Sequence, residues 1–311
     1  MNAPCGSAFM PTNSRGSPFM ATGAVGDADV GMNADPRGGT LGRIVLLLVL
    51  LCTNLAQATE APQRVVSLNL CTDQILLTLL PHARIAMLSQ LAADRTLSWA
   101  AARADGIARF DGSVERIVQL GPDLVLTGSQ ASLGSAAVLK RLGYRVETIE
   151  MPETIAGSLA FIEHTAALLG EAEAGAALSR EAARRLDAVR AAMAGRPRAL
   201  GLVYLPNGLS PGSGTLKDEL LAIAGWRNLA SERGIVGYGT LPLEDLVAHA
   251  PQAVLFDAVD LEHASLAQQL LRHPALSHHV PSRTVPTASW ICGGPQIAEA
   301  AEALARLRGK L

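Results

Sequence analysis

Aromatic residues and clustered charges are both scarce in this chain. Phe, Trp and Tyr make up 4% of the residues, and the formal net charge is -2 at pH 7 with no run of lysine and arginine. A nucleic-acid partner is therefore not expected, because phosphates require a basic surface. With so few aromatic residues, each one in a loop becomes a candidate for contact with an apolar ligand.

The sequence also lacks the motifs of nucleotide and metal sites. The glycine-rich segment 211–215 has neither the Lys-Ser/Thr ending of a P-loop nor the three-glycine dinucleotide pattern, so at most it would hold an anion at the start of the following helix. The histidines are scattered, and the pair His278-His279 lacks partners at a zinc-binding spacing. No resident cofactor or metal ion is expected.

A marked apolar run lies near the N-terminus. Residues 44–51 follow an arginine and lead to Ala56-Gln57-Ala58, which has small residues at its first and third positions. A positive flank, a short apolar core and small residues in this order predict a signal peptide cleaved after Ala58, which makes residues 1–58 an N-terminal extension and export signal. A permanent membrane helix and a lipid anchor at Cys52 are weaker alternatives, because the run is short and Cys52 lacks a preceding small residue.

Two distant segments follow one template. Residues 114–126 and 243–255 share a glutamate, a central valine, a proline and a closing Val-Leu. Each pattern predicts a short helix, a proline stop and a buried strand, because proline disfavours helix in the residue before it and an apolar run suits a strand covered on both faces. The repeat predicts two similar α/β lobes, with Glu115 and Glu244 near helix starts, where the helix dipole favours carboxylates.

Strands and helices alternate on either side of a long helical region. The pattern predicts an N-terminal α/β lobe at 59–153, an inter-lobe helical segment at 154–195, and a C-terminal α/β lobe at 196–311 with a loop at 206–214. The Ala-, Leu- and Glu-rich stretch 171–193 is long enough to bridge the lobes. The expected fold class is α/β, with two Rossmann-like lobes joined by a single long helix and a ligand cleft between them.

The order and spacing of these segments resemble a known family. The chain is similar to periplasmic substrate-binding proteins of ABC importers, in the group that binds cobalamin, iron siderophores or haem. The resemblance is carried by the Arg-Val-Val-Ser-Leu opening at 64–68, by both template segments, and by residues 210–229 with Gly225. It implies a two-lobed fold that closes only slightly around its ligand.

The resemblance also implies partners. Glu115 and Glu244, one in each lobe, would dock onto arginines of an ABC permease, which works with an ATPase subunit. Paired carboxylate and guanidinium groups would fix the orientation of docking. The alternative is that both residues are ordinary helix-start carboxylates. The protein itself is expected to be a periplasmic monomer.

Candidate ligand contacts are placed mainly where predicted strands end, because ligand crevices of open α/β sheets form there. Trp290, which follows a strand, is the first candidate. The others are aromatic residues in or beside loops and residues at strand ends: Asn69, Leu70, Cys71, Trp99, Phe110, Ser129, Gln130, Tyr204 and Tyr238. Trp226 is expected to be a packing residue.

Of the four cysteines, only Cys71 and Cys292 remain once the leader is removed. Both fall on predicted cleft loops, in opposite lobes. In an oxidising compartment they would form a disulfide if their Cα atoms approach within about 7 Å. Otherwise they would be separate or buried thiols, and the sequence leaves both alternatives open.

Taken with the resemblance, these observations predict a non-enzymatic, exported protein that captures a metal chelate (a corrinoid, a ferric siderophore or haem) and delivers it to an ABC permease. A zinc- or manganese-binding protein of the same fold is the nearest alternative, although its cleft histidines are not matched. An exported hydrolase would need a nucleophile on a sharp strand-to-helix turn with a base and an orienting acid, and no histidine is placed by a motif. A purely structural envelope protein would need no cleft.

Overall fold

The computed structural model describes residues 60–129, 132–262, 266–274, 276 and 280–310. These residues belong to one compact unit, Thr59–Leu311. The predicted signal peptide with its cleavage site after Ala58, the candidate ligand residue Gln130 and the pair His278-His279 lie outside the described residues. Within the described part of the chain, no helix combines the length and apolar character needed to cross a membrane.

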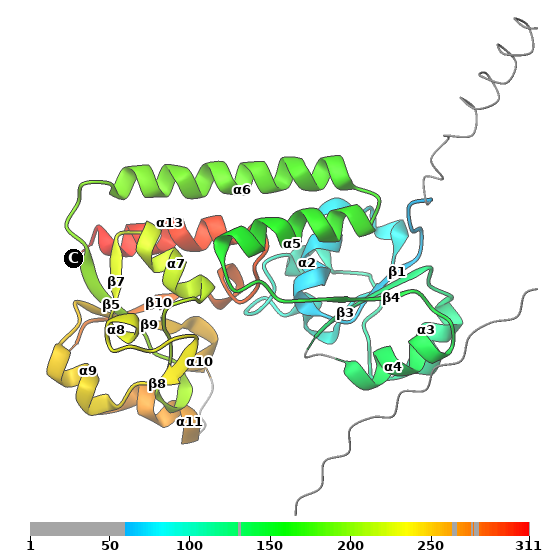
Figure 1. The fold of residues 1–311 in the computed structure, drawn as a ribbon. Helices are drawn as coiled ribbons and strands as arrows, with labels where there is room; N and C mark the ends of the chain where they lie inside the picture. The colour runs from blue at the N-terminus through cyan, green and yellow to red at the C-terminus, as the bar shows by residue number, and fades with distance from the viewer. Residues whose placement is uncertain (1–59, 130–131, 263–265, 275, 277–279, 311) are drawn as a thin grey trace, which may run out of the picture. The chain divides into compact units, whose positions relative to one another are not determined.

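The N-terminal lobe (N-lobe) is built on a four-stranded parallel sheet (Figure 1). Its strands, in spatial order, are β2 (Ile85–Met87), β1 (Val65–Ser67), β3 (Leu124–Gly128) and β4 (Val146–Ile149). Its helices are α2 (Leu70–Leu79), α3 (Val114–Leu120), α4 (Leu133–Arg141) and α5 (Ile155–Leu168), with short single-turn helices at His82–Arg84, Gln90–Ala93 and Ala101–Arg103. The predicted alternation of strands and helices is confirmed.

Alternating side chains of β3 divide the core of this lobe into two layers. Leu124 and Leu126 pack with residues of α2 and α5 on one face of the sheet, whereas Val125 packs with Ile117 of α3 and Leu139 of α4 on the other. The division follows from the two-residue period of a strand. All of β3 is buried, as expected for an inner strand of a parallel sheet covered on both faces.

The C-terminal lobe (C-lobe) repeats this plan. Four parallel strands run in the order β10 (Ser282–Val285), β9 (Ala253–Asp257), β5 (Ala199–Val203) and β7 (Trp226–Asn228). An antiparallel pair is formed by β6 (Leu209–Pro211) and β8 (Tyr238–Thr240). The helices are α7 (Leu216–Ile223), α8 (Leu229–Glu232), α9 (Leu243–His249), α10 (Ala258–Glu262), α11 (Leu266–Gln269) and α13 (Ile297–Arg308), with single-turn helices at Pro206–Gly208, Leu270–Arg272 and Thr287–Ser289.

The two template segments have the same local structure. In each, a seven-residue helix (α3 or α9) ends at a residue in the left-handed conformation, a proline follows, and a fully buried strand (β3 or β9) begins two residues later. The left-handed residue is Gly121, at φ 54°, in the first segment and Ala250, at φ 41°, in the second. The predicted helix, proline stop and buried strand are confirmed in both lobes.

Helix α6 (Ala172–Met193) connects the lobes. Leu178, in its first half, packs against the N-lobe core, and Leu186 and Val189, in its second half, belong to the C-lobe core. Figure 1 shows α6 running beside α5 and α13. The predicted α/β fold with two lobes and one long connecting helix is confirmed, although α5 packs into the N-lobe core through Phe161 and Ile162.

Candidate functional site

A pocket of about 270 Å³, which we call the central pocket, is lined by residues of both lobes. The lining residues are Asn69, Cys71, Met151, Pro152, Glu153, Thr215, Leu216, Lys217, Tyr238, Trp290, Ile291 and Gly293. Many of them follow the carboxyl ends of the parallel strands β1, β4 and β10. Ligand crevices of open α/β sheets form at such strand ends, so this pocket is the candidate site.

Asn69 forms part of the N-lobe wall and is held in place by its own helix. Its side-chain Oδ1 accepts hydrogen bonds from the backbone N–H groups of Cys71, at 2.8 Å, and Thr72, at 3.3 Å. Asn69 is therefore the N-cap of α2, a position where Asn satisfies N–H groups that the helix leaves unbonded. The cap fixes both the helix start and the wall of the pocket.

A disulfide joins Cys71 to Cys292, with the two Cα atoms 5.3 Å apart. Cys71 is in the first turn of α2, whereas Cys292 lies in the loop before α13. Close packing continues beside the bond, because Gly293 approaches Pro152 so closely that a Cβ atom at this position would have no room. Of the alternatives that the sequence leaves open, the structure contains the disulfide, and it ties the two lobes together beside the pocket.

A buried cluster of three side chains forms the C-lobe wall. Lys217 Nζ lies 2.6 Å from Asp257 Oδ2 and 4.3 Å from the centroid of the Trp290 ring. Asp257 Oδ1 accepts a hydrogen bond from Trp290 Nε1. The three residues come from the first turn of α7, the end of β9 and the loop after β10. The cluster therefore fixes Trp290, the first candidate residue, at the wall of the pocket.

Tyr238 and Glu153 complete the polar surroundings. Tyr238 belongs to β8 and remains 54% exposed. Burial of the phenol group raises the pKa of Tyr238, and the carboxylates of Asp257 and Glu153 raise it further. Burial also raises the pKa of Asp260; Asp257 adds to this effect and Lys217 opposes it. The pocket therefore combines aromatic surface with one carboxylate and one ammonium in its lining, and the carboxylates of Asp257 and Asp260 lie close behind.

A second hollow, of about 410 Å³, is lined by residues of the N-lobe and shares Asn69 with the central pocket. We call it the N-lobe pocket. Its other lining residues are Leu68, Leu70, Ser89, Gln90, Leu91, Phe110, Asp111, Gly112 and Ser132. Because Asn69 belongs to both walls, the two pockets are neighbours, and a large ligand in one would reach the other.

Asp73 is a fully buried carboxyl group behind the N-lobe pocket. Ser89 donates hydrogen bonds to it from the backbone N–H, at 3.2 Å, and from the hydroxyl, at 2.5 Å. Burial raises the pKa of Asp73 to about 7, although hydrogen bonds from Ser67 and Ser89 act in the opposite direction. Ser89 lines the N-lobe pocket, so a change in the protonation of Asp73 would change the hydrogen bonds of a residue in that pocket's wall.

The structure brings many of the predicted ligand residues to the two pockets. Asn69, Cys71, Tyr238 and Trp290 line the central pocket, and Asn69, Leu70 and Phe110 line the N-lobe pocket. Trp99 packs against the N-lobe core, and its Nε1 donates to Glu299 of α13 at 3.0 Å. Ser129 follows β3 and lines neither pocket.

Tyr204 was expected to contact the ligand, but it lines neither pocket. Its side chain is completely buried in the C-lobe core, and its hydroxyl donates to the carbonyl of Leu241 at 3.2 Å. The residue follows β5, but the segment from Pro206 to Pro211 and the chain after β8 cover this strand end. Tyr204 is therefore a core residue. Trp226 is likewise buried, and its Nε1 donates to the carbonyl of Leu304 at 3.0 Å, which confirms its packing role.

Lys217, Asp257, Glu153 and Ile291 belong to the site but were not predicted from the sequence. One signal for Asp257 was available, because it ends the strand of the second template segment at the edge where ligands bind. Lys217 has no such signal, because a lysine in the first turn of a helix is common and nothing in the sequence indicates that this one is buried.

Glu115 and Glu244 lie outside both pockets. Each is exposed and stands in the first turn of its short helix, α3 or α9. The hydroxyl of Ser113 donates to Glu115 Oε2 at 3.0 Å. The backbone N–H of Glu115 itself and then this hydroxyl hold the pKa of Glu115 below its usual value. The two glutamates occupy corresponding positions in the two lobes.

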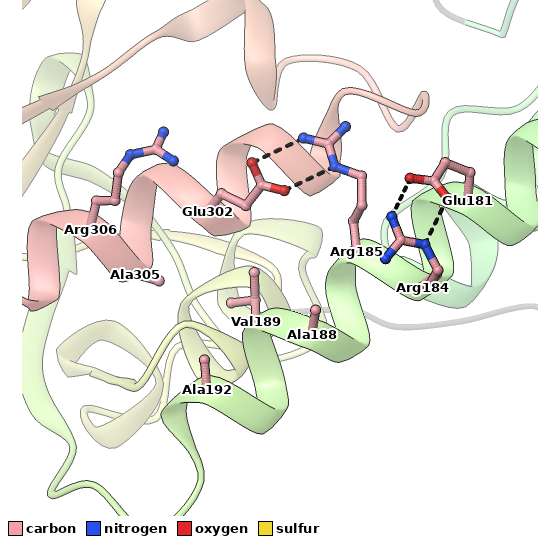
Figure 2. A pocket seen from close by; sticks show the side chains of 9 residues that line it. All are labelled: Glu181, Arg184, Arg185, Ala188, Val189, Ala192, Glu302, Ala305 and Arg306. Atoms are coloured by element: carbon pink, nitrogen blue, oxygen red, sulfur yellow. Dashed lines mark hydrogen bonds and ion pairs between the residues drawn. The ribbon is translucent and has the colours of Figure 1, made fainter.

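A larger hollow, of about 640 Å³, lies between α6 and α13 (Figure 2). Its floor consists of small aliphatic side chains, and ion pairs stand at its rim. Arg185 pairs with Glu302 at 2.9 and 3.0 Å, and Arg184 pairs with Glu181 at 2.8 and 2.6 Å. Among the described residues, no aromatic side chain and no strand end lines it. We therefore assign the candidate site to the central pocket.

Two observations bear on the metal-binding and hydrolase alternatives. The described residues contain no group of three or more His, Cys, Asp or Glu side chains placed to hold a metal ion. The segment Gly208, Leu209, Ser210, Pro211, Gly212 has the Gly-x-Ser-x-Gly spacing of a hydrolase nucleophile. However, Ser210 is buried inside β6, and its hydroxyl donates to the carbonyl of Gly208 at 3.4 Å. It does not stand on an exposed strand-to-helix turn.

Comparison with known proteins gives one family and several similar folds. A family model described as "Periplasmic binding protein" matches residues 65–280. No curated protein sequence matches the chain.

Solved structures with a similar fold include the periplasmic haem-binding protein RhuT from Roseiflexus sp. RS-1, with a TM-score of 0.64 and 22% identity over 79% of this chain and 96% of that chain. The periplasmic haem-binding protein HutB of Vibrio cholerae has a TM-score of 0.65 and 18% identity over 79% and 98% of the two chains. The periplasmic vitamin B12 binding protein BtuF of Vibrio cholerae has a TM-score of 0.59 and 16% identity over 81% and 99%.

Proposed function

Since this chain belongs to the periplasmic binding protein family, as the match over residues 65–280 shows, we propose that it captures a metal chelate and delivers it to the permease of an ABC importer. The observation that carries this proposal is the central pocket, which both lobes line at their strand ends and to which Tyr238 and Trp290 contribute aromatic surface. Aromatic side chains with a few polar groups suit a bulky organic ligand that holds a metal.

The ligand classes that we propose are corrinoids, ferric siderophores and haem. Structures of similar fold include haem-binding RhuT and HutB and vitamin B12-binding BtuF, which supports this choice. The central pocket, at about 270 Å³, is slightly below the roughly 300–1,000 Å³ of typical small-molecule sites. A bulky chelate would therefore place one part there and extend over the N-lobe pocket, which shares Asn69.

We propose that the protein works in the periplasm as a monomer without catalytic activity. The chain would be exported by the signal peptide at residues 1–58 and cleaved after Ala58. The disulfide between Cys71 and Cys292 supports this location, because disulfides persist in oxidising compartments.

For docking, we propose that Glu115 and Glu244 pair with arginines of the permease, which acts with its ATPase subunit. Both glutamates are exposed and occupy corresponding helix starts in the two lobes. Two separated pairs of carboxylate and guanidinium would orient the loaded protein, because each pair fixes one lobe.

Calorimetric titration of residues 59–311 tests the proposed function. The ligands are cyanocobalamin, haemin and ferric trihydroxamates, with free Zn²⁺ and Mn²⁺ as controls. We expect one chelate to bind saturably. Ile291→Trp places a larger side chain at the pocket and should weaken binding by about tenfold or more, equivalent to roughly 1.4 kcal/mol. Leu266→Trp, at a highly exposed position outside both pockets, is the matched control.

The other outcomes separate the alternatives. Binding of free metal without any chelate would support a zinc- or manganese-binding protein. Equal loss of binding in Ile291→Trp and Leu266→Trp would show that the central pocket is not the site. Absence of every ligand response would contradict the proposed function.

A further inference from the structure

The positive charge of Lys217 is already balanced inside the protein. Lys217 is the only basic side chain among the described residues that line the central pocket. Its side chain is 9% exposed, and its Nζ lies 2.6 Å from Asp257 Oδ2. A ligand carboxylate that drew Lys217 away would leave Asp257 buried without its cation, which is unfavourable. Lys217 is therefore poorly suited to recognising an anionic ligand group.

Carboxylates outnumber ammonium groups around this pocket. Glu153 lines the pocket, and Asp257 lies directly behind Lys217. Asp260 lies within electrostatic reach of both Asp257 and Lys217, since both affect its pKa. Asp257 and Asp260 thus share the ammonium of Lys217, and Glu153 adds a further carboxylate at the pocket wall, so these four groups together are negative.

The carboxylates beside the pocket also act on Tyr238. After burial, the larger cause, the carboxylates of Asp257 and Glu153 raise the pKa of this phenol. The same two carboxylates would oppose a ligand anion placed beside Tyr238, and they would favour a hydrogen-bond donor or a cation there.

Helix starts beside the pocket do not reverse this preference. Helices α2, α5 and α7 begin next to lining residues, and open helix starts attract anions. Each start is capped by a side chain of the protein itself. The acceptors are Asn69 for α2, Glu219 for α5 at 2.6 Å, and Thr215 for α7 at 3.2 Å. These N–H groups are therefore not available to a ligand.

We propose that the part of the chelate held in the central pocket carries a hydrogen-bond donor that is cationic or neutral, such as an ammonium, guanidinium or carboxamide group. A carboxylate, phosphate or catecholate group at the same position is disfavoured. Glu153 and Tyr238 are the residues that contact this group and set the preference. The inference rests on the proposed function and specifies the charge class of its ligand.

Two matched sets of chelates test the preference without changing the metal centre. Ferrioxamine B ends in an ammonium group; its N-acetyl derivative has a neutral amide there, and its N-succinyl derivative has a carboxylate. In the second set, cyanocobalamin is compared with its monocarboxylates, in which one peripheral carboxamide is hydrolysed. Within the set that binds, we expect the carboxylate form to bind about tenfold more weakly, and added salt to narrow the difference.

Glu153→Gln identifies the source of the preference. This change removes a carboxylate at nearly constant size and should tighten binding of the carboxylate form several-fold. Glu150→Gln, at an exposed position outside the central pocket, is the control and should leave the preference unchanged.

Small probes test the charge of the pocket independently of any chelate. Methylguanidinium and acetate are added separately while the NMR signals of the Tyr238 ring are followed, with assignment from their loss in Tyr238→Phe. We expect saturable shifts with methylguanidinium and none with acetate. Tyr144, which lies outside both pockets, is the internal control.

The outcomes distinguish failure of this inference from failure of the proposed function. Equal or tighter binding of the carboxylate forms, or shifts of Tyr238 with acetate alone, would overturn the charge preference and leave chelate binding in place. Absence of binding by every member of both sets and by haemin would overturn the proposed function. In that case the response of Tyr238 to methylguanidinium or to acetate still decides the charge of the pocket.

Discussion

Cys71 and Cys292 are separated by 221 positions in the sequence and are joined by a disulfide beside the central pocket. The bond links α2 of the N-lobe to the loop before α13. The main chain itself passes from the N-lobe to the C-lobe through α6. Trp290, two residues before Cys292, is held by the buried Asp257. The disulfide therefore connects the N-lobe wall of the pocket to a rigid part of the C-lobe.

Loss of this disulfide should lower stability substantially. A cross-link over a long segment restricts the unfolded chain, and removal of a native disulfide typically costs about 2–5 kcal/mol of the free energy of unfolding. Thermal unfolding of the protein with and without a reductant measures the change. The control is Cys71→Ser combined with Cys292→Ser, whose melting temperature should not respond to reductant. Thiol titration is used to confirm that the disulfide is reduced. If the melting temperature is unchanged once reduction is confirmed, the prediction is contradicted.

The ion pair of Lys217 and Asp257 should show strong coupling between its members. Lys217→Met or Asp257→Asn alone disturbs the charge balance of a buried pair. For Lys217→Met we expect a loss of about 3–5 kcal/mol in the free energy of unfolding, because Asp257 stays buried without its cation. The double variant should lose less than the sum of the single losses. The exposed pair Arg184 and Glu181 is the comparison, and its coupling should be much weaker because water screens both charges. Additive losses at Lys217 and Asp257 would argue against the pair.

Asp73 should make stability depend on pH. Its pKa is about 7 in the folded protein because of burial, whereas an unfolded aspartate has a pKa near 3.9. Between these values the folded state holds a proton that the unfolded state has lost. Stability from this group is therefore complete below about pH 4 and falls by roughly 4 kcal/mol as the pH rises to about 7.

Denaturant unfolding of the protein and of Asp73→Asn from pH 5 to pH 8 isolates this contribution. The variant should gain stability relative to the unmodified protein as the pH rises, because it cannot ionise. Asp187→Asn, on the exposed surface of α6, controls for general effects of removing an aspartate. Parallel pH profiles for the protein and Asp73→Asn would show that Asp73 titrates normally.

Local patterns were sufficient to predict most of the fold. The proline after each short helix and the apolar run after it define α3, β3, α9 and β9, since both signals act within a few residues. The Gly, Pro and Ser residues of the segment 206–214 predict a loop, yet the segment contains β6. This strand exists only through pairing with β8, a contact that no local pattern encodes.

The strand-end rule placed Asn69 and Trp290 at the pocket but failed for Tyr204, because tertiary packing covers the end of β5. Lys217 shows the complementary limit. A lysine in a helix start normally faces solvent, and its burial depends on Asp257 and Trp290, which are distant in sequence. Sequence patterns thus locate the edge where a site forms, whereas the buried charges that set its chemistry require the three-dimensional structure.

Replacing Ala250 with glycine should raise the free energy of unfolding. Ala250 holds a left-handed conformation, at φ 41°, that costs a side-chain-bearing residue about 1–2 kcal/mol, and the corresponding residue of the first template segment is Gly121. Part of the gain in Ala250→Gly is offset by greater freedom of the unfolded chain, so we expect a stabilisation of about 0.5–1 kcal/mol. The reciprocal change Gly121→Ala should destabilise by a similar amount. Denaturant unfolding of both variants measures the pair of effects, and equal signs would contradict the explanation.

Glu115 and Glu244 should affect transport without affecting ligand capture. Glu115→Gln and Glu244→Gln remove exposed charges that line neither the central pocket nor the N-lobe pocket, so the dissociation constant for the chelate should stay unchanged. Stimulation of the ATPase of the cognate importer in proteoliposomes should fall by about tenfold, because each change removes one charged pair of the docked complex. Glu173→Gln, at the exposed start of α6, is the matched control for a helix-start carboxylate. If all three variants stimulate the importer equally, Glu115 and Glu244 serve only their own helices.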